Sequence, residues 1–257
     1  MKYNYLLVEI DEDIAYVSLN HTSANNELET GMAKELLVLA KELSMNENIK
    51  IIVLGARGEN FSIGVPRSES GEFDEEYSPI ALAGSVIEEW ARLPYPILAA
   101  VNGRCESLGF SLACIADIRY AGENAVFSVP EATWGVVPAG GITHRLPRLI
   151  GKGPAMMMLL GAEPISADRA LELGLVVKVT DEESLWDEVC NEAKRLASLS
   201  TLSMQYTKEC LIRGSELPLE QALRLELDVY MLLQTSEDRM EGVNAFLQKR
   251  SPQFIGK

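Results

Sequence analysis

The sequence predicts an α/β fold with a helical C-terminal portion. Through most of the 257 residues, segments with a strand-like pattern are followed by segments with a helix-like pattern. The strand-like segments are β-branched apolar runs or switch between apolar and polar residues, and the helix-like segments have apolar residues at helical spacing. From residue 153 onward the pattern indicates helices alone. Strands that alternate with helices are typical of an α/β body, and the later helical run indicates a second structural portion. We therefore expect an α/β core at residues 1–200 and a helical region at residues 201–257.

Each element is predicted from its own pattern. Apolar and polar residues alternate over residues 5–10 and 14–19, on both sides of the acidic turn Asp11-Glu12-Asp13, and this pattern indicates a β-hairpin. The segment 58–78 is rich in Gly, Ser and Glu, and we expect a mobile loop there. The remaining strands are expected over 49–54, 97–102, 118–120 and 125–128, and helices over 28–43, 80–92, 108–116, 153–160, 166–173, 182–198, 203–213, 219–233 and 236–249.

The formal charge of -15 restricts the kinds of partner that the chain can bind. A charge of this sign disfavours nucleic acid and anionic membrane surfaces. No charged-then-apolar leader precedes the first strand, and no apolar run is long enough to span a bilayer. The four cysteines and two histidines show no metal-ligand spacing, so we expect reduced thiols and no metal site. We expect a cytoplasmic protein.

One carboxylate stands out in the segment 127–146. Glu131 lies in an almost uncharged stretch between Pro130 and a run of Gly and Pro, with no basic residue nearer than His144 and Arg145. Such a glutamate is either a solvated loop residue, which is the commoner case, or a buried acid with a raised pKa that exchanges protons near neutrality. Trp134 could line a pocket and desolvate the acid, or it could be ordinary core.

Two glycine-containing turns follow predicted buried strands. One is Asn60-Phe-Ser-Ile-Gly-Val-Pro66, and the other runs from Asn102 to Ser111 into the apolar helix. Free N–H groups at a helix N-terminus carry partial positive charge and suit a developing oxyanion. Each turn alone is a weak signal. Together with an acid from a third segment, they could stabilise the enolate of a thioester.

Several segments follow one another in a specific order and spacing along nearly the whole chain. They are Val17-Ser-Leu-Asn20 with Asn26 and Leu28, Gly58 to Gly64, Pro96-Ile-Leu-Ala-Ala-Val-Asn-Gly103, Ala116-Asp-Ile-Arg-Tyr-Ala121, Phe127 to Leu146, Gly161 with Ala167 and Ala170, Leu173-Gly-Leu-Val176, and Glu241 to Arg250. No single segment is decisive, but in this order and spacing they resemble the crotonase (enoyl-CoA hydratase/isomerase) superfamily.

The resemblance implies a ClpP/crotonase-type spiral of ββα repeats whose C-terminal helical region forms a trimer or a dimer of trimers. It implies an acyl-CoA thioester as substrate and no separate cofactor. Carried over by position, the catalytic groups are the acid Glu131 and the backbone N–H groups of Ile63 and Leu108. The residues implied in substrate and CoA binding are Ala24, Asn26, Ile63, Gly64, Val65, Arg67, Leu108, Ser111, Trp134, Phe246 and Lys249.

The chain departs from the family pattern at one catalytic position. Hydratases of this family hold water between two glutamates; the second falls on Glu131, but the first falls on Ser111. A serine hydroxyl cannot exchange protons near neutral pH as a carboxylate does, although it could orient a water. We expect Ser111 to be a small packing residue on a buried helix rather than a catalytic group. One acid is similar to the pattern of enoyl-CoA isomerases, where a single carboxylate moves a proton between two carbons.

Other departures concern the substrate pocket. Leu108 stands where the family usually has glycine, so its side chain must fill space near the acyl group, as in the carboxymethylproline synthases. Pro66 stands where aspartate is common. Arg67 could meet a CoA phosphate or remain a solvated loop residue, and Lys249 would be a helix-end lysine without the resemblance.

These observations predict an acyl-CoA enzyme, either an enoyl-CoA isomerase or a hydratase. Two other functions stay open: C–C bond formation, cleavage or decarboxylation through the same enolate, and a non-catalytic acyl-CoA-binding paralogue. The acyl group, and the choice between CoA and carrier-protein thioesters, are not predicted.

Overall fold

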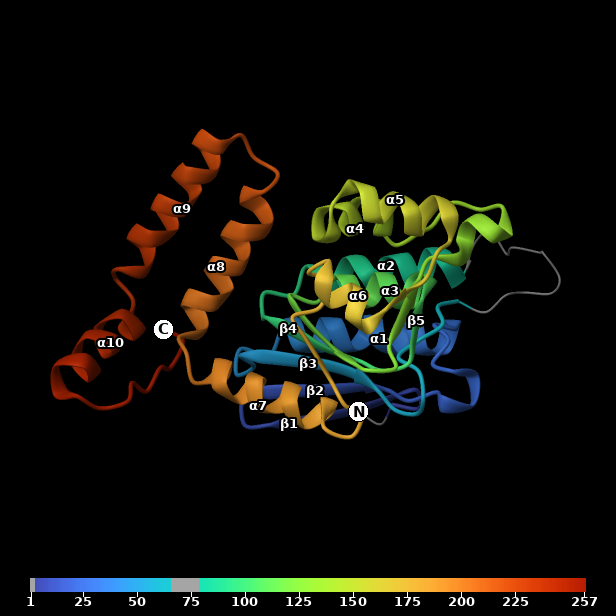
Figure 1. The fold of residues 1–257 in the computed structure, drawn as a ribbon. Coiled ribbons are helices and arrows are strands. Elements are labelled where there is room, and N and C mark those ends of the chain that lie inside the picture. The colour runs from blue at the N-terminus through green and yellow to red at the C-terminus, as the bar shows by residue number, and fades with distance from the viewer. Residues whose placement is uncertain (1–2, 66–78) are drawn as a thin grey trace.

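The computed structural model describes residues 3–65 and 79–257 and shows two β-sheets surrounded by helices (Figure 1). The large sheet has the strand order β1-β2-β3-β4-β6-β9, and the small sheet has the order β5-β7-β8. In the large sheet β1 pairs antiparallel with β2, and the other neighbours are parallel. The strands are β1 (Leu6–Asp11), β2 (Ile14–Leu19), β3 (Ile51–Ala56), β4 (Ile97–Val101), β5 (Arg104–Glu106), β6 (Ile118–Gly122), β7 (Val126–Ser128), β8 (Ile165–Ser166) and β9 (Lys178–Thr180).

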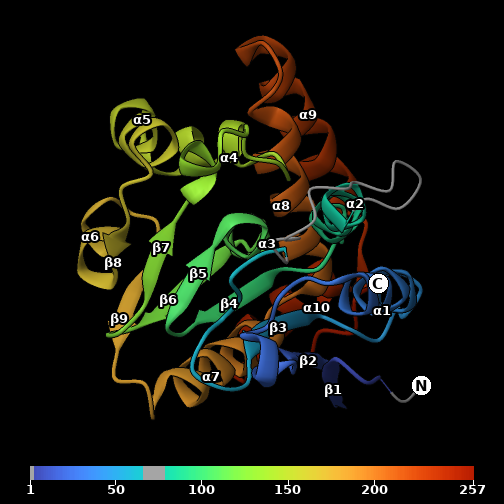
Figure 2. The ribbon, with the colours of Figure 1, turned by 90° about the vertical axis from the view of Figure 1, so that its right-hand side faces the viewer.

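The elements repeat in a spiral, as Figure 2 shows from the side. Each repeat places a strand in the large sheet, then a strand in the small sheet, then a helix: β4-β5-α3 and β6-β7-α4 follow this order. In the repeat that begins with β3, the second strand is reduced to a single bridge between Ser62 and Cys105. The helices are α1 (Thr30–Ser44), α2 (Pro79–Ala91), α3 (Ser107–Cys114), α4 (Ile142–Ile150), α5 (Lys152–Gly161), α6 (Ala167–Glu172), α7 (Leu185–Ala197), α8 (Thr201–Gly214), α9 (Leu219–Leu233) and α10 (Glu237–Gln248).

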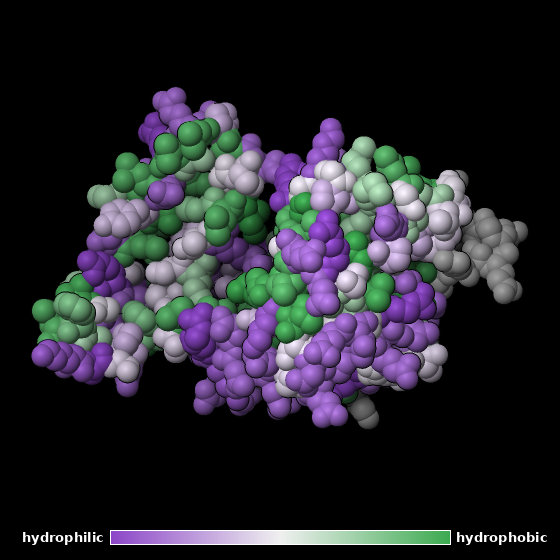
Figure 3. Space-filling view, viewed as in Figure 1, coloured by the Kyte–Doolittle hydropathy of each residue, from purple (hydrophilic) through white to green (hydrophobic). Residues whose placement is uncertain are grey.

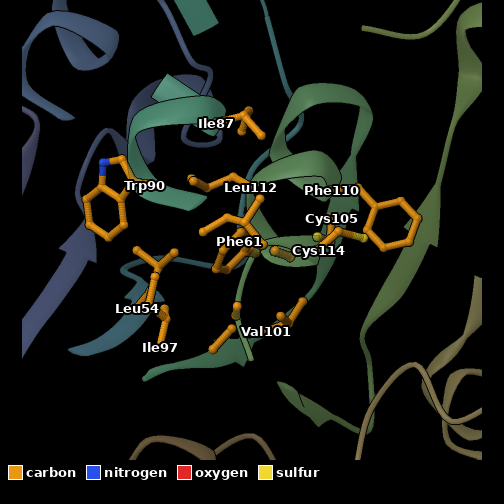
Figure 4. Close-up of a cluster of buried hydrophobic side chains, with 14 of the residues drawn as sticks. Leu54, Phe61, Ile87, Trp90, Ile97, Val101, Cys105, Phe110, Leu112 and Cys114 are labelled. Carbon is orange, nitrogen blue, oxygen red and sulfur yellow. The ribbon is translucent and has the colours of Figure 1, made fainter. Parts of the chain in front are cut away.

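β3 is buried on both faces of the large sheet, which explains its continuous apolar run. Ile52 and Leu54 join the main core, whereas Ile51 and Val53 pack in a second cluster with α7. A parallel strand covered on both faces reads as an uninterrupted β-branched run. Figure 4 shows the main core around Phe61, where side chains from α2, α3 and β4 converge beneath the turn that follows β3.

The C-terminal helices project away from this core (Figure 1). Lys208 of α8 links them to it, donating to the carbonyl of Tyr95 at 2.8 Å and pairing with Asp117 at 2.8 Å. No residue of α9 is buried in the single chain, and Leu219 and Leu227 are 74% and 58% exposed. Figure 3 shows hydrophobic residues gathered over these helices and over α4 and α5.

The predicted fold class is confirmed, and most predicted helices and strands are present to within a few residues. Four of these helices and strands were not predicted: β5, β8, β9 and α4. The three strands have two or three residues each, too few to show a period, and α4 contains Pro147 near its end and follows a Gly-Gly pair that suggests a turn. The predicted boundary at residue 200 falls directly before α8; the division into two domains stays a prediction.

In the described ranges, 3–65 and 79–257, no helix combines the length and apolar character needed to cross a bilayer.

The turn that follows β3 packs tightly on the beginning of α3. Ser62 donates its N–H to the carbonyl of Arg104 at 3.2 Å, and its carbonyl accepts the N–H of Glu106 at 2.9 Å. Gly109 in the first turns of α3 lies against it: a Cβ at Gly109 would come within 2.6 Å of the Ser62 Cβ and 2.7 Å of its carbonyl oxygen. The absence of a side chain at Gly109 therefore sets how closely the turn and the helix approach.

We expect Gly109→Ala to lower the free energy of unfolding by about 1–3 kcal/mol, because the added methyl group forces backbone apart. Gly84→Ala is the matched control, since Gly84 lies inside α2 and a Cβ there would have no described neighbour within 4 Å. The control should gain about 0.5–1 kcal/mol from helix propensity. Urea unfolding of both variants measures the difference; equal stability of the two would contradict the packing described here.

Candidate active site

Three backbone segments meet at one place in the fold: the turn at residues 62–65, the start of α3, and the 3₁₀ helix Pro130–Trp134 that follows β7. The parallel pairing of β5 with β7 brings the second and third together. Phe110 of α3 packs on Phe127 of β7 with ring centroids 5.4 Å apart, which fixes the helix against the strand that leads to Glu131.

Asn26 holds the first turn in place. Its side chain is buried, and its Nδ2 donates to the carbonyls of Arg57 and Asn60, both at 2.8 Å, while its Oδ1 accepts the N–H of His21 at 2.7 Å. Its carbonyl accepts the Ser62 hydroxyl at 2.7 Å. The amide of Asn26 is thus occupied by the chain itself, and the structure gives it a positioning role; the predicted substrate contact stays a prediction.

The N–H groups of Ile63 and Leu108 are both free to donate. Leu108 is the second residue of α3, and N–H groups in the first turn of a helix have no intrahelical acceptor. Within residues 3–65 and 79–257, neither N–H has a hydrogen-bond acceptor. Gly64 permits the approach of the two segments: a Cβ there would lie 2.7 Å from the Ser107 Cβ. The structure thus brings both predicted donors to adjoining turns.

Glu131 is buried, with 5% of its surface exposed, so of the two interpretations left open by the sequence the structure shows the buried acid. Its Oε1 accepts a hydrogen bond from the Ser107 hydroxyl at 2.6 Å, and in the described part of the chain its buried Oε2 has no partner. Burial raises the pKa of Glu131 above its ordinary value; hydrogen bonds from Ser107 and from backbone N–H oppose this, and the charge of Glu106 adds to it.

Ser107 was not predicted as a site residue. Its φ of 53° lies in the left-handed region, which costs a residue other than glycine about 1–3 kcal/mol. The residue is 3% exposed and begins α3. A single sequence carries no signal for this contact, because neither the backbone angle nor the proximity to Glu131, 24 positions away, can be read from it.

Ser111 lies on the buried face of α3. Its hydroxyl lies 3.2 Å from the carbonyl of Ala139 and 3.4 Å from that of Ser107, so it has acceptors within the chain. These contacts fit the packing interpretation of Ser111 and hold the loop after Glu131 against α3. Leu108 is buried against the same loop, because a Cβ at Gly140 would lie 2.5 Å from its Cδ2.

The remaining predicted binding residues are scattered. Trp134 is half-buried at the end of the 3₁₀ helix, and Ala24 and Val65 are half-buried near the first turn. Phe246 and Lys249 lie on and after α10, away from the three segments (Figure 1), and Phe246 is 83% exposed. The structure does not bring these two to Glu131 within one chain. Arg67 lies outside the described residues.

The family model for enoyl-CoA hydratase/isomerase matches residues 9–257 of the chain. The chain belongs to this family, within the crotonase superfamily. It is an enzyme of the enoyl-CoA hydratase/isomerase type, which processes acyl-CoA. The resemblance inferred from the sequence is confirmed.

Named relatives cover almost the whole chain. It is 34% identical over 255 residues to the 2,3-dehydroadipyl-CoA hydratase of Escherichia coli (strain K12), covering 98% of this chain and 99% of the relative. It is 33% identical to the (E)-benzylidenesuccinyl-CoA hydratase of Thauera aromatica, with 97% and 98% covered. A solved enoyl-CoA hydratase from Bacillus anthracis superimposes with a TM-score of 0.95 at 29% identity, covering 99% and 100% of the two chains.

The raised pKa of Glu131 predicts a pH-dependent effect of Glu131→Gln on stability. A group whose pKa is raised on folding binds its proton more tightly in the folded state, so wild-type stability falls as pH rises from the ordinary value of 4.5 through the folded one. The glutamine variant lacks this loss. Its free energy of unfolding should therefore increase relative to wild type between pH 4 and pH 8 by urea unfolding. A difference independent of pH would contradict the raised pKa.

Proposed function

We propose that the enzyme shifts the double bond of an enoyl-CoA thioester by moving one proton with Glu131. The substrate is the CoA thioester itself, and no further cofactor takes part. The observation that carries this proposal is one buried carboxylate beside two N–H groups on adjoining turns, where neither its Oε2 nor the two N–H groups have a partner among the described residues.

The N–H groups of Ile63 and Leu108 would receive the thioester oxygen. Glu131 as carboxylate removes the α-proton of a 3-enoyl thioester, and the electron pair moves onto the thioester oxygen, where the two N–H donors stabilise the negative charge. The protonated Glu131 then returns the proton to the γ-carbon, which gives the 2-enoyl thioester. A carboxyl with a raised pKa is suited to both steps, since it takes and returns a proton near neutral pH.

One carboxylate suffices for this reaction. Among the described residues, Glu106 is the other acid whose charge acts on Glu131, and its carboxylate is held by Arg104 at 2.9 and 2.7 Å. Ser111 occupies the position of the first hydratase acid and cannot replace its proton transfer.

Hydration of a 2-enoyl thioester is the second candidate function. The names of the relatives favour it, because the proteins from Escherichia coli and Thauera aromatica are both named as hydratases. In this case the water would be held by Glu131 with a hydroxyl as second partner, and Glu131 would take its proton.

Glu131→Gln should lower turnover by about 10²–10⁴-fold and leave CoA thioester binding nearly unchanged, because it removes the proton carrier but keeps the shape. Mass spectrometry of 2-enoyl-, 3-enoyl- and malonyl-CoA thioesters in deuterated water separates the reactions. Isomerisation exchanges α- or γ-hydrogens, hydration adds water, and malonyl-CoA reports decarboxylation.

Glu163→Gln is the matched control, since Glu163 is exposed, and it should behave as wild type. Ser111→Ala should change turnover much less than Glu131→Gln. Wild-type exchange in Glu131→Gln would show that another base forms the enolate.

We also propose that the chain assembles as a trimer or a dimer of trimers through its C-terminal helices. The exposed apolar side chains of α9 and α10 are too many for an isolated helical tail in water. Phe246 and Lys249 could then reach the site of a neighbouring subunit.

This assembly predicts a mass of three or six chains in light scattering. Leu227→Glu, which places a charge on the exposed face of α9, should lower that mass because a buried unpaired charge is costly. Glu220→Gln on the same helix is the control, and its mass should be unchanged. A monomer mass that does not depend on concentration would contradict the assembly.

A further inference from the structure

Ser107 adopts a conformation that glycine would take without strain. Its φ is 53°. In the described ranges, the other non-glycine residues with positive φ lie in turns or at the C-terminal ends of helices: Glu12, Asn25, Asn26, Ala162 and Lys249. Ser107 begins α3 and is almost fully buried. An unfavourable backbone conformation persists only where the surroundings hold it, and such positions cluster at functional sites.

The side chain that this position carries makes one short contact. The Ser107 hydroxyl donates to Oε1 of Glu131 at 2.6 Å, whereas Oε2 has no partner in the part of the chain that the structure describes. The contact is compatible with both protonation states of the acid, because Oε1 accepts from Ser107 whether Oε2 carries a proton or not. The two oxygens of the carboxyl group therefore have different surroundings, because Ser107 binds Oε1 and not Oε2.

Ser107 also touches the other two parts of the site. Its carbonyl carbon forms the peptide bond to the nitrogen of Leu108, whose N–H has no acceptor among the described residues. Its side chain occupies the space that Gly64 leaves open, since a Cβ at Gly64 would lie 2.9 Å from the Ser107 hydroxyl oxygen. One residue thus connects the acid, the helix donor and the turn that carries Ile63.

We propose that Ser107 is a positioning residue that holds Oε1 of Glu131 at a fixed place relative to the Leu108 N–H, so that Oε2 is the oxygen that transfers the proton. This inference rests on the proposed function of Glu131. The strained backbone is retained because it directs the hydroxyl to the carboxylate.

Two variants separate this role from a role in the turn alone. Ser107→Gly removes the hydroxyl and relieves the strain, and Ser107→Ala removes the hydroxyl and keeps the strain. Both should lower kcat by about 10–100-fold with little change in KM, the amount expected for one hydrogen bond to a charged group. The relieved strain should offset part of the stability lost with the hydrogen bond, so Ser107→Gly should be more resistant to urea than Ser107→Ala.

Ala162→Gly is the matched control, because Ala162 has a φ of 51° at the end of α5 and takes no part in the site. It relieves the same strain and should leave kcat unchanged. Wild-type kcat in Ser107→Gly would overturn the proposal, since a residue that serves only the turn is replaced by glycine without loss.

The pH dependence gives a second readout that a structural role would not move. In wild type the hydrogen bond from Ser107 stabilises the ionised form of Glu131, so losing it raises the pKa of Glu131. The limb of the kcat profile that reports Glu131 should therefore shift to higher pH in both Ser107 variants. Infrared titration of the carboxyl band that disappears in Glu131→Gln measures the same shift without turnover. A titration midpoint equal to that of wild type would overturn the proposal.

The same set of variants separates failure of the inference from failure of the proposed function. If Glu131→Gln loses turnover while both Ser107 variants keep wild-type kcat and pH profile, the inference alone is wrong. If Glu131→Gln keeps wild-type turnover, the proposed function of Glu131 is wrong and the inference is overturned with it.

Discussion

The close approach of two backbone segments is the constraint on which the site depends. The turn after β3 and the first turns of α3 approach so closely that side chains at Gly64 and Gly109 would collide with Ser107 and Ser62. The buried parallel strands β3 and β4 set the starting points of both segments, and the amide of Asn26 holds the turn from outside. The fold thus supplies two N–H groups in a rigid arrangement, before any ligand is considered.

The acid is placed in the same surroundings for an electrostatic reason. Burial destabilises the carboxylate of Glu131, whereas the Ser107 hydroxyl and backbone N–H stabilise it. The balance raises the pKa of the group without removing its ability to ionise. A carboxyl in this state can take and return one proton, which is the requirement of the proposed double-bond shift.

Much of this arrangement could be predicted from the sequence. The β-branched runs of β3 and β4 and the helical spacing of α1 report burial directly, and the isolated position of Glu131 among apolar residues left a buried acid as one of two interpretations. Other features could not be predicted, because they depend on backbone angles and long-range contacts. The strained φ of Ser107 and its hydrogen bond to Glu131 are of this kind, as is the internal use of the Asn26 amide.

The central claim is that the N–H groups of Ile63 and Leu108 bind the oxygen of a thioester carbonyl. Infrared spectroscopy of a carbonyl-labelled 2-enoyl-CoA bound to Glu131→Gln, which prevents turnover, tests it directly. Two donors in a water-excluded site polarise the carbonyl group, so the account predicts a stretching frequency below that of the same thioester free in water. A bound thioester whose carbonyl frequency equals the free value would contradict it.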